Sequence, residues 1–321
     1  MILNKFWVLD GHNDTMLALP HQRRSFHVRS EKGHIDLPRM REGNFQAGLF
    51  AVWPCFTSRM IKKWTKNWFS IVKNEKNELM QIKKYEDFAI AENLGKIGAV
   101  LHFESVGGFD RELTMLDHYY KLGLRSFSLT WFETNEFATG ARMLGKEKKQ
   151  GLTDVGRILI NKAQSLGINI DVSHLNIPSF WDVLEIAEKK PITATHSDAY
   201  SIANHRRNLN DAQIKAIHET HGTIGINFGT LFLNPKKPGK TNRDLGFDVV
   251  KQHIDHIVSV ADINTVSMGS DFDGAIVPKC LKNCAQFPKL FDFLLENGYS
   301  EQDIKKISHE NWMRVLKATW A

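Results

Sequence analysis

Short runs of β-branched and apolar residues alternate along this chain with stretches whose apolar residues recur at helical spacing. Eight such runs are recognisable, at 6–10, 47–53, 98–103, 125–130, 169–172, 191–195, 223–228 and 265–269. We interpret each run as a buried strand and each intervening stretch as one or more helices. Strands that alternate with helices in this way predict a parallel sheet.

The helical stretches have recognisable faces and ends. One apolar face follows the i, i+3, i+4, i+7 spacing, at Phe180, Val183, Leu184 and Ala187. Pro191 ends that helix. Asn210 is placed to cap the next helix, and Gly222 to end it. The stretch 58–95 is long for one helix, so we expect two there.

Eight strand–helix units in one chain favour closure into a (β/α)₈ barrel of the TIM type. The chain has 321 residues, and such barrels take roughly 250 residues or more as one unit. We therefore expect a single domain over residues 1–321. An open, doubly wound sheet is the alternative.

Composition narrows the class of protein. Hydrophobic residues make up 42% and charged residues 24%, a soluble globular balance. No apolar run approaches the ~20 residues of a membrane span, and residues 1–7 lack the pattern of a signal peptide. Three cysteines do not make a disulfide framework. We expect a cytoplasmic protein that binds no membrane.

The formal net charge of +6 does not indicate a nucleic-acid partner. Lysines cluster mildly near 62–63, 83–84 and 146–149, but acidic residues lie among them. Solvated helix faces explain this pattern better than a groove for nucleic acid.

Candidate chemistry follows the strands, because barrel active sites lie at the C-terminal strand ends. Five of the eight predicted strands end in histidine or acidic residues: His12 and Asp14 after the first, Glu104 after the third, His174 after the fifth, His196 after the sixth and Asp271 after the eighth. His12 and Asp14 are two residues apart, so in an extended segment they point the same way.

Each of these residues taken alone has an ordinary explanation. A single histidine at a strand end is more often structural than a ligand, and a lone aspartate is more often a turn former or helix cap. Convergence on one face of a barrel makes the functional interpretation stronger. Three histidines and two carboxylates suit zinc or a similar divalent metal. Five ligands are more than one tetrahedral zinc ion can bind. With Glu104 bridging, the ligands divide between two ions.

Several short motifs occur in a familiar order. They are Gly11-His12-Asn13-Asp14, Asp171-Val172-Ser173-His174, Thr195-His196-Ser197, Arg207-Asn208-Leu209 and Ser270-Asp271-Phe272-Asp273-Gly274. Together they resemble the membrane dipeptidase (renal dipeptidase) family over nearly the whole chain.

The resemblance implies a dizinc dipeptidase on a (β/α)₈ barrel. By the matching positions, His12, Asp14 and Glu104 would hold one zinc, while Glu104, His174 and His196 would hold the other. Asp271 would lie beside the bridging water, and Arg207 would bind the substrate carboxylate. We assign Asn208, next to Arg207 in its motif, to substrate binding as well.

The chain departs from the family in three places. Many members have a histidine after the fourth strand that contacts the substrate, whereas this chain has Trp131, whose indole N–H can donate one hydrogen bond. We keep Trp131 as a substrate-binding residue. A tyrosine associated with the run after the seventh strand is absent, since Gly229 follows Phe228. The lipid anchor of the animal members is not carried over.

The expected mechanism is hydrolysis of a dipeptide by a metal-bridging hydroxide, with Asp271 moving the proton and Arg207 gripping the carboxylate. Other barrel amidohydrolases, such as cyclic amidases, lactonases and deaminases, remain alternatives, as does an inactive barrel that acts as a binding protein. The expected partner is a small dipeptide, and a homodimer stays open.

Overall fold

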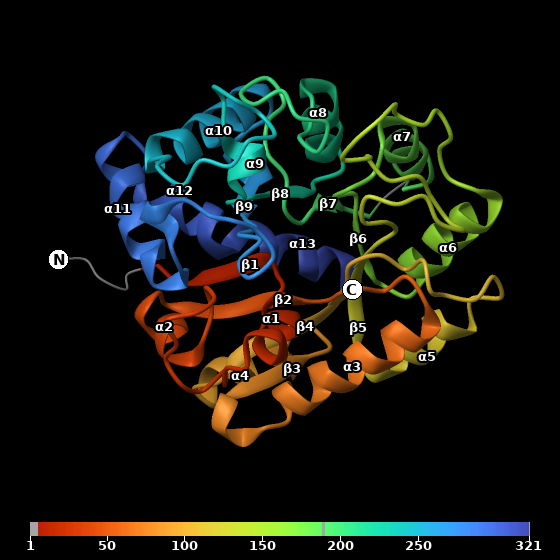
Figure 1. Ribbon diagram of the computed structural model, residues 1–321, viewed down its shortest axis with the longest axis horizontal. Coiled ribbons are helices and arrows are strands. Elements are labelled where there is room, and N and C mark those ends of the chain that lie inside the picture. The colour runs from red at the N-terminus through yellow and green to blue at the C-terminus, as the bar shows by residue number, and fades with distance from the viewer. Residues whose placement is uncertain (1–5, 188–189, 321) are drawn as a thin grey trace.

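The eight predicted runs form the strands of a closed parallel barrel in the computed structural model, which describes residues 6–187 and 190–320 (Figure 1). Neighbouring strands pair around the ring, and β2 with β4 and β1 with β9 complete it. The strands are β1 (Val8–Asn13), β2 (Phe45–Val52), β4 (Ile97–Phe103), β5 (Leu124–Ser128), β6 (Asn169–Asp171), β7 (Ile192–Ala194), β8 (Thr223–Ile226) and β9 (Val266–Met268). The predicted (β/α)₈ fold is confirmed.

The first strand differs from its prediction. It was expected over 6–10, but β1 continues to Asn13 and pairs with β2 as far as Phe50. Polar residues such as His12 are typical of loops, but here they are buried residues of the strand. The first five residues, on which the expectation about a leader depends, lie outside the described part of the chain.

A ninth strand, β3 (Leu79–Ile82), was not predicted. It pairs with residues 97–100 of β4, and β5 takes over the same edge of β4 from Leu101 onward. The strand has only four residues, the middle two are partly exposed, and it therefore lacks a clear apolar pattern. The two helices expected over 58–95 are present on either side of it, as α3 (Ser58–Val72) and α4 (Asp87–Asn93).

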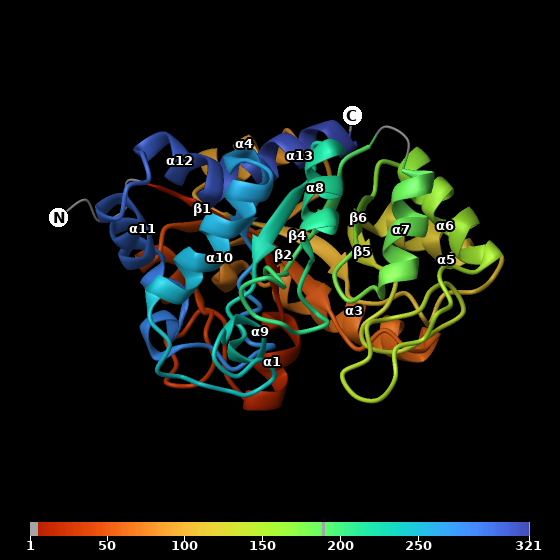
Figure 2. The same cartoon turned by 90° about the horizontal axis from the view of Figure 1, so that it is seen from above.

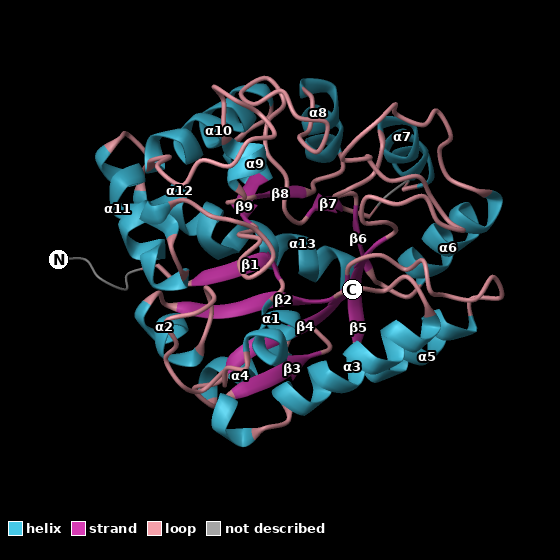
Figure 3. Ribbon diagram, viewed as in Figure 1, coloured by secondary structure: helices cyan, strands magenta, loops and turns pink. Residues whose placement is uncertain are grey.

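The remaining helices surround the strands (Figure 3). They are α1 (Thr15–Gln22), α2 (Leu37–Glu42), α5 (Thr114–Leu122), α6 (Asp154–Ser165), α7 (Ile177–Ile186), α8 (Asp211–Glu219), α9 (Thr230–Leu233), α10 (Phe247–Val260), α11 (Phe287–Glu296), α12 (Glu301–Lys305) and α13 (Asn311–Trp320). Short 3₁₀ turns occur at Glu75–Asn77, Ile263–Thr265, Lys279–Leu281 and Cys284–Gln286, and a π-helical turn, Lys306–Glu310, leads into α13.

Local sequence explains where several helices begin and how they face. Asn210 caps α8 in a reciprocal capping box with Gln213, as its position predicted, although α8 ends at Glu219, before Gly222. In α7 the predicted face is turned inward, and Phe180 and Val183 are buried in the core. None of the helices in the described residues is both long and apolar enough to cross a bilayer.

The two ends of the barrel are built differently (Figure 2). At the N-terminal end, α13 lies across the strands, and the Trp312 indole donates to the Met268 carbonyl at 2.9 Å. A Cβ on Gly11 would lie 2.3 Å from the Trp312 ring, so this ring reaches from α13 into the barrel and fills its interior closely. At the other end lie α1, α9 and the long loops. Chemistry is therefore left to the C-terminal strand ends.

Candidate metal centre

Six buried ionisable side chains meet at the C-terminal end of the barrel. Each lies at a strand end or within three residues of one: His12 and Asp14 at β1, Glu104 after β4, His174 after β6, His196 after β7 and Asp271 after β9. The structure thus brings together the five candidate metal ligands and the candidate proton acceptor that the sequence singled out.

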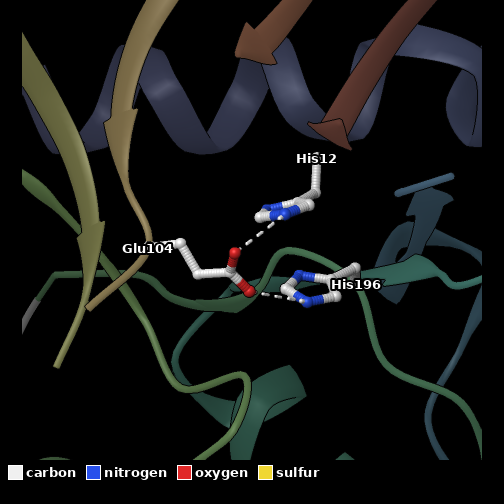
Figure 4. Close-up of side chains that lie close together, drawn as sticks. All are labelled: His12, Glu104 and His196. Carbon is white, nitrogen blue, oxygen red and sulfur yellow. Dashed lines mark ion pairs between the residues drawn. The ribbon is translucent and has the colours of Figure 1, made fainter. Parts of the chain in front are cut away.

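Glu104 lies at the centre of this group, with its two carboxylate oxygens facing different imidazoles (Figure 4). Oε2 is 3.8 Å from Nε2 of His12. Oε1 is 3.0 Å from Nε2 of His174 and 3.7 Å from Nε2 of His196. A carboxylate placed this way can offer one oxygen to each of two neighbouring cations.

The donor set fits a divalent metal. The ligand atoms of His12, Glu104 and His196 lie within 4.8 Å of one another, and so do those of His12, Asp14 and Asp271. Both ring nitrogens of His12 and Oδ1 of Asp14 are buried without a hydrogen-bond partner. Buried polar atoms are rarely left unpaired. Imidazole and carboxylate donors in this arrangement are those that zinc prefers.

A hydrogen-bonded relay fixes which nitrogen of His196 can bind a cation. The Thr195 hydroxyl donates its single proton to Oδ2 of Asp171 at 2.7 Å, so it accepts from Nδ1 of His196, 2.8 Å away. Nε2 of His196 is then left with its lone pair facing Glu104. Such outer partners orient metal-binding histidines and raise their basicity.

The surroundings of the cluster shift the pKa values of its histidines in opposite directions. Burial lowers the pKa of His12, but the carboxylates of Glu104 and Asp14 outweigh it and raise that pKa to about 10. Burial, followed by positively charged neighbours, lowers the pKa of both His174 and His196 well below the usual value. Burial and then Asp14 raise the pKa of Glu104 well above its usual range. The crowded carboxylates favour an added positive charge.

Asp271 is held by a tight turn beside Asp14. Its backbone has φ = 57°, and Nδ2 of Asn227 donates to its Oδ2 at 3.0 Å. Burial is the main cause that raises the pKa of Asp271 to about 6. Gly274 closes the turn, and a Cβ there would lie 2.0 Å from Oδ2 of Asp14 and 2.6 Å from Oδ1 of Asp271. A side chain at position 274 would therefore displace both carboxylates.

Arg207 and Asn208 follow β7 and lie behind the histidines. Arg207 is buried and donates to Oγ of Ser197 and to the carbonyl of His196, both at 2.7 Å, while its Nε has no acceptor. It lines a cavity of about 740 Å³ that His174 also borders. Asn208 donates to the carbonyls of Ala203 and Phe232, so its amide ties the loop after β7 to α9.

Trp131 lies in the wall of a separate cleft of about 340 Å³ directly over the cluster. Asp14, Glu104, His174, His196 and Asp271 line the same cleft, whereas Arg207 does not. The two cavities share Met143 and His174. The predicted substrate-binding residues are therefore distributed over two adjoining spaces.

Three residues that hold the site's side chains in place were not predicted from the sequence. Asp171 and Thr195 orient His196, and Asn227 holds Asp271. Asp171 and Thr195 lie within the recognised motifs, and Asn227 directly follows β8. A polar residue at a strand end was the available signal, but its partners lie on other strands.

The whole chain, residues 1–321, matches the family model described as membrane dipeptidase (peptidase family M19). A metallo peptidase from Rhodobacter sphaeroides, solved with a phosphinate mimic of the dipeptide L-Ala-D-Ala, is 30% identical with a TM-score of 0.91 over 98% of this chain and 99% of that one.

Two further relatives agree. The solved dipeptidase AC of family M19, a metallo peptidase, is 30% identical with a TM-score of 0.91 over 99% of both chains. An uncharacterized dipeptidase of Schizosaccharomyces pombe is 30% identical over 97% of this chain and 80% of its own length. By sequence, fold and cluster of donors, the chain belongs to the membrane dipeptidase family, peptidase family M19, and is a metal-dependent dipeptidase.

Proposed function

We propose that the chain is a dizinc dipeptidase in which Glu104 bridges two ions and Asp271 moves the proton during hydrolysis. The observation that carries this proposal is the position of Glu104, whose two oxygens face His12 on one side and His174 with His196 on the other. Asp14 completes the first ligand set.

When bound, the two ions would polarise the peptide carbonyl and lower the pKa of a water from 15.7 towards about 7, which supplies hydroxide at neutral pH. The chain's own residues do the rest. Asp271 borders the cleft beside Asp14 and can accept a proton from water and return it to the leaving amine. Asn227 keeps one oxygen of Asp271 occupied, which leaves the other for this transfer.

Arg207 limits the length of the substrate. Its guanidinium lies behind His196 and borders the cavity that adjoins the metal cleft. A carboxylate bound there by a charge-assisted pair would place the scissile bond only one residue away. This geometry favours dipeptides over longer peptides. The Rhodobacter sphaeroides peptidase, whose ligand mimics a dipeptide, supports the same substrate class.

The test is hydrolysis by protein reconstituted with zinc, followed as release of free amino acids from Leu-Gly, Ala-Ala and the tripeptide Leu-Gly-Gly. We expect both dipeptides to be cleaved, the tripeptide to be cleaved far more slowly, and a chelator to abolish the reaction. The matched control is Leu-Gly amide, which lacks the carboxylate. Equal cleavage of Leu-Gly and its amide would favour an amidohydrolase of another kind, and no cleavage by the zinc-loaded protein would favour a binding protein.

A further inference from the structure

One wall of the cleft over the metal ligands is aromatic. Trp53 follows β2 and Trp131 follows β5, and their rings meet edge to face with centroids 5.1 Å apart. Phe132 packs against Trp131 at 4.7 Å and reaches the ring of His174 at 4.6 Å. We call Trp53, Trp131 and Phe132 the aromatic wall. It extends to the edge of the metal centre itself.

Apart from the carboxylates of the metal centre, the described residues of the cleft offer no free partner for a charged side chain. Among the described residues that line it, there is no lysine or arginine. Small or apolar residues, including Leu231, Ala275 and Ile276, also line the cleft. Asp273, which also borders the cleft, is already paired with Arg24 at 2.6 Å. A charged side chain placed here would be desolvated without compensation, whereas an apolar one would bury its surface.

The position of Arg207 decides which substrate residue meets the wall. Arg207 lies in the adjoining cavity of about 740 Å³, which shares only Met143 and His174 with the cleft. With the substrate carboxylate at Arg207, the C-terminal residue lies in that larger cavity, beside polar residues such as Asn176 and Asn204. The N-terminal residue then lies in the cleft, against the aromatic wall.

We infer that the aromatic wall, with Trp131 at its centre, selects dipeptides whose N-terminal side chain is large and apolar. This rests on the proposed function, since it takes the carboxylate to be at Arg207. Burial of a Leu or Phe side chain against the wall should raise kcat/KM about 10- to 100-fold over glycine at the same position. The roomier C-terminal cavity should discriminate much less.

The experiment compares mirror pairs of dipeptides. Zinc-loaded wild type should cleave Phe-Gly and Leu-Gly about 10- to 100-fold more efficiently than Gly-Phe, Gly-Leu and Gly-Gly, and should disfavour Lys-Gly and Asp-Gly. Trp131→Ala should lower kcat/KM for Phe-Gly far more than for Gly-Gly, and Trp131→Phe should retain much of the advantage of Phe-Gly. The matched control is Trp181→Ala, because Trp181 is 41% exposed on α7 and lines neither cavity.

A binding measurement separates this inference from the proposed function. Calorimetry should show that the phosphinate analogue of Phe-Gly binds more tightly than the analogue of Gly-Phe. Trp131→Ala should remove this difference in affinity. If dipeptides are cleaved but Gly-Phe equals or exceeds Phe-Gly, the selection by the wall is wrong and the dipeptidase stands. If no dipeptide is cleaved, the proposed function is wrong, and the two analogues still decide whether the wall prefers an apolar N-terminal residue.

Discussion

The metal centre has two halves that share Glu104 but are held in place by different means. His12, Asp14 and Asp271 form the carboxylate half, which depends on backbone turns. Asp271 has φ = 57°, and the next turn residue, Asp273, has φ = 69° and is tied to Arg24. Such left-handed backbone is uncommon outside glycine and is kept where surrounding contacts enforce it.

His174 and His196 form the imidazole half. His174 also has left-handed backbone, with φ = 70°, but here side chains from other strands hold the rings as well. Thr195 and Asp171 orient His196, Phe132 packs against His174, and Arg207 lies behind both. The proposed function assigns different tasks to the halves. The proposed proton acceptor, Asp271, belongs to the carboxylate half, while Arg207, the proposed binding site for the substrate carboxylate, adjoins the imidazole half. Variants in each half should therefore fail in different ways.

Loss of the shared residue should have the largest effect because it damages both halves. Glu104→Gln should lower metal content towards zero at both sites and reduce hydrolysis by more than the ~10²–10⁴-fold expected for a single acid–base residue. Elemental analysis of chelator-free protein measures the metal, with about two ions expected for wild type. His174→Ala should lose mainly one ion. Retention of two ions by Glu104→Gln would rule out the bridge.

Asp271→Asn tests the carboxylate half alone. An amide cannot accept the proton, so kcat should fall about 10²–10⁴-fold, while the amide oxygen still accepts the hydrogen bond from Asn227. Metal content should stay near that of wild type. If the variant loses an ion instead, Asp271 is a ligand and the division between holding metal and moving protons is wrong.

Arg207→Met tests the substrate side of the imidazole half. Loss of the charge-assisted pair should lower kcat/KM for Leu-Gly about 10- to 100-fold and hardly change that for Leu-Gly amide. The matched control is Arg157→Met, because Arg157 lies on α6, pairs with Asp182 and Glu185, and lines neither cavity. If both variants lower kcat/KM for Leu-Gly equally, Arg207 contributes only general positive charge.

The clustered donors and the contacts that support them differed in how far they could be predicted. All the clustered donors lie at strand ends, and the closure of a parallel barrel brings such ends together whatever the intervening sequence. His12 was identified although its strand was placed too early, because the error did not change the end of the barrel to which it belongs. The position of each donor at a strand end was sufficient to predict that the donors cluster.

The supporting contacts followed no such rule. Asp171 and Thr195 are 24 residues apart, and Asn227 and Asp271 are 44 apart, so their pairing depends on strand register and side-chain geometry. The separation of Arg207 from the cleft that Trp131 lines likewise depends on how loops fill space. β3 was missed because four residues, of which the middle two are partly exposed, carry too little periodic signal.

The smallest effect on turnover is expected from Thr195→Val, which removes the relay of the imidazole half without touching a ligand. The valine cannot accept from Nδ1 of His196, so the ring loses its fixed tautomer, and zinc affinity at that half should fall about 10- to 100-fold. Chelator competition measures the affinity. At saturating zinc the variant should turn over within a few fold of wild type, because Asp271 and Arg207 are unchanged.

Thr193→Val is the matched control for this last variant. Thr193 lies in β7, two residues before Thr195, which directly follows that strand, and its hydroxyl bonds Asn169 and Ile170 rather than a ligand. Both variants lose one buried hydroxyl, so a comparable cost in stability is expected from each. Only Thr195→Val should weaken zinc. If Thr193→Val weakens it equally, the loss reflects general loosening of the barrel, and the imidazole half is not oriented by its relay. If neither does, packing against Phe132 and the neighbouring rings is sufficient to hold the histidines, and the two halves differ less than their hydrogen bonds indicate.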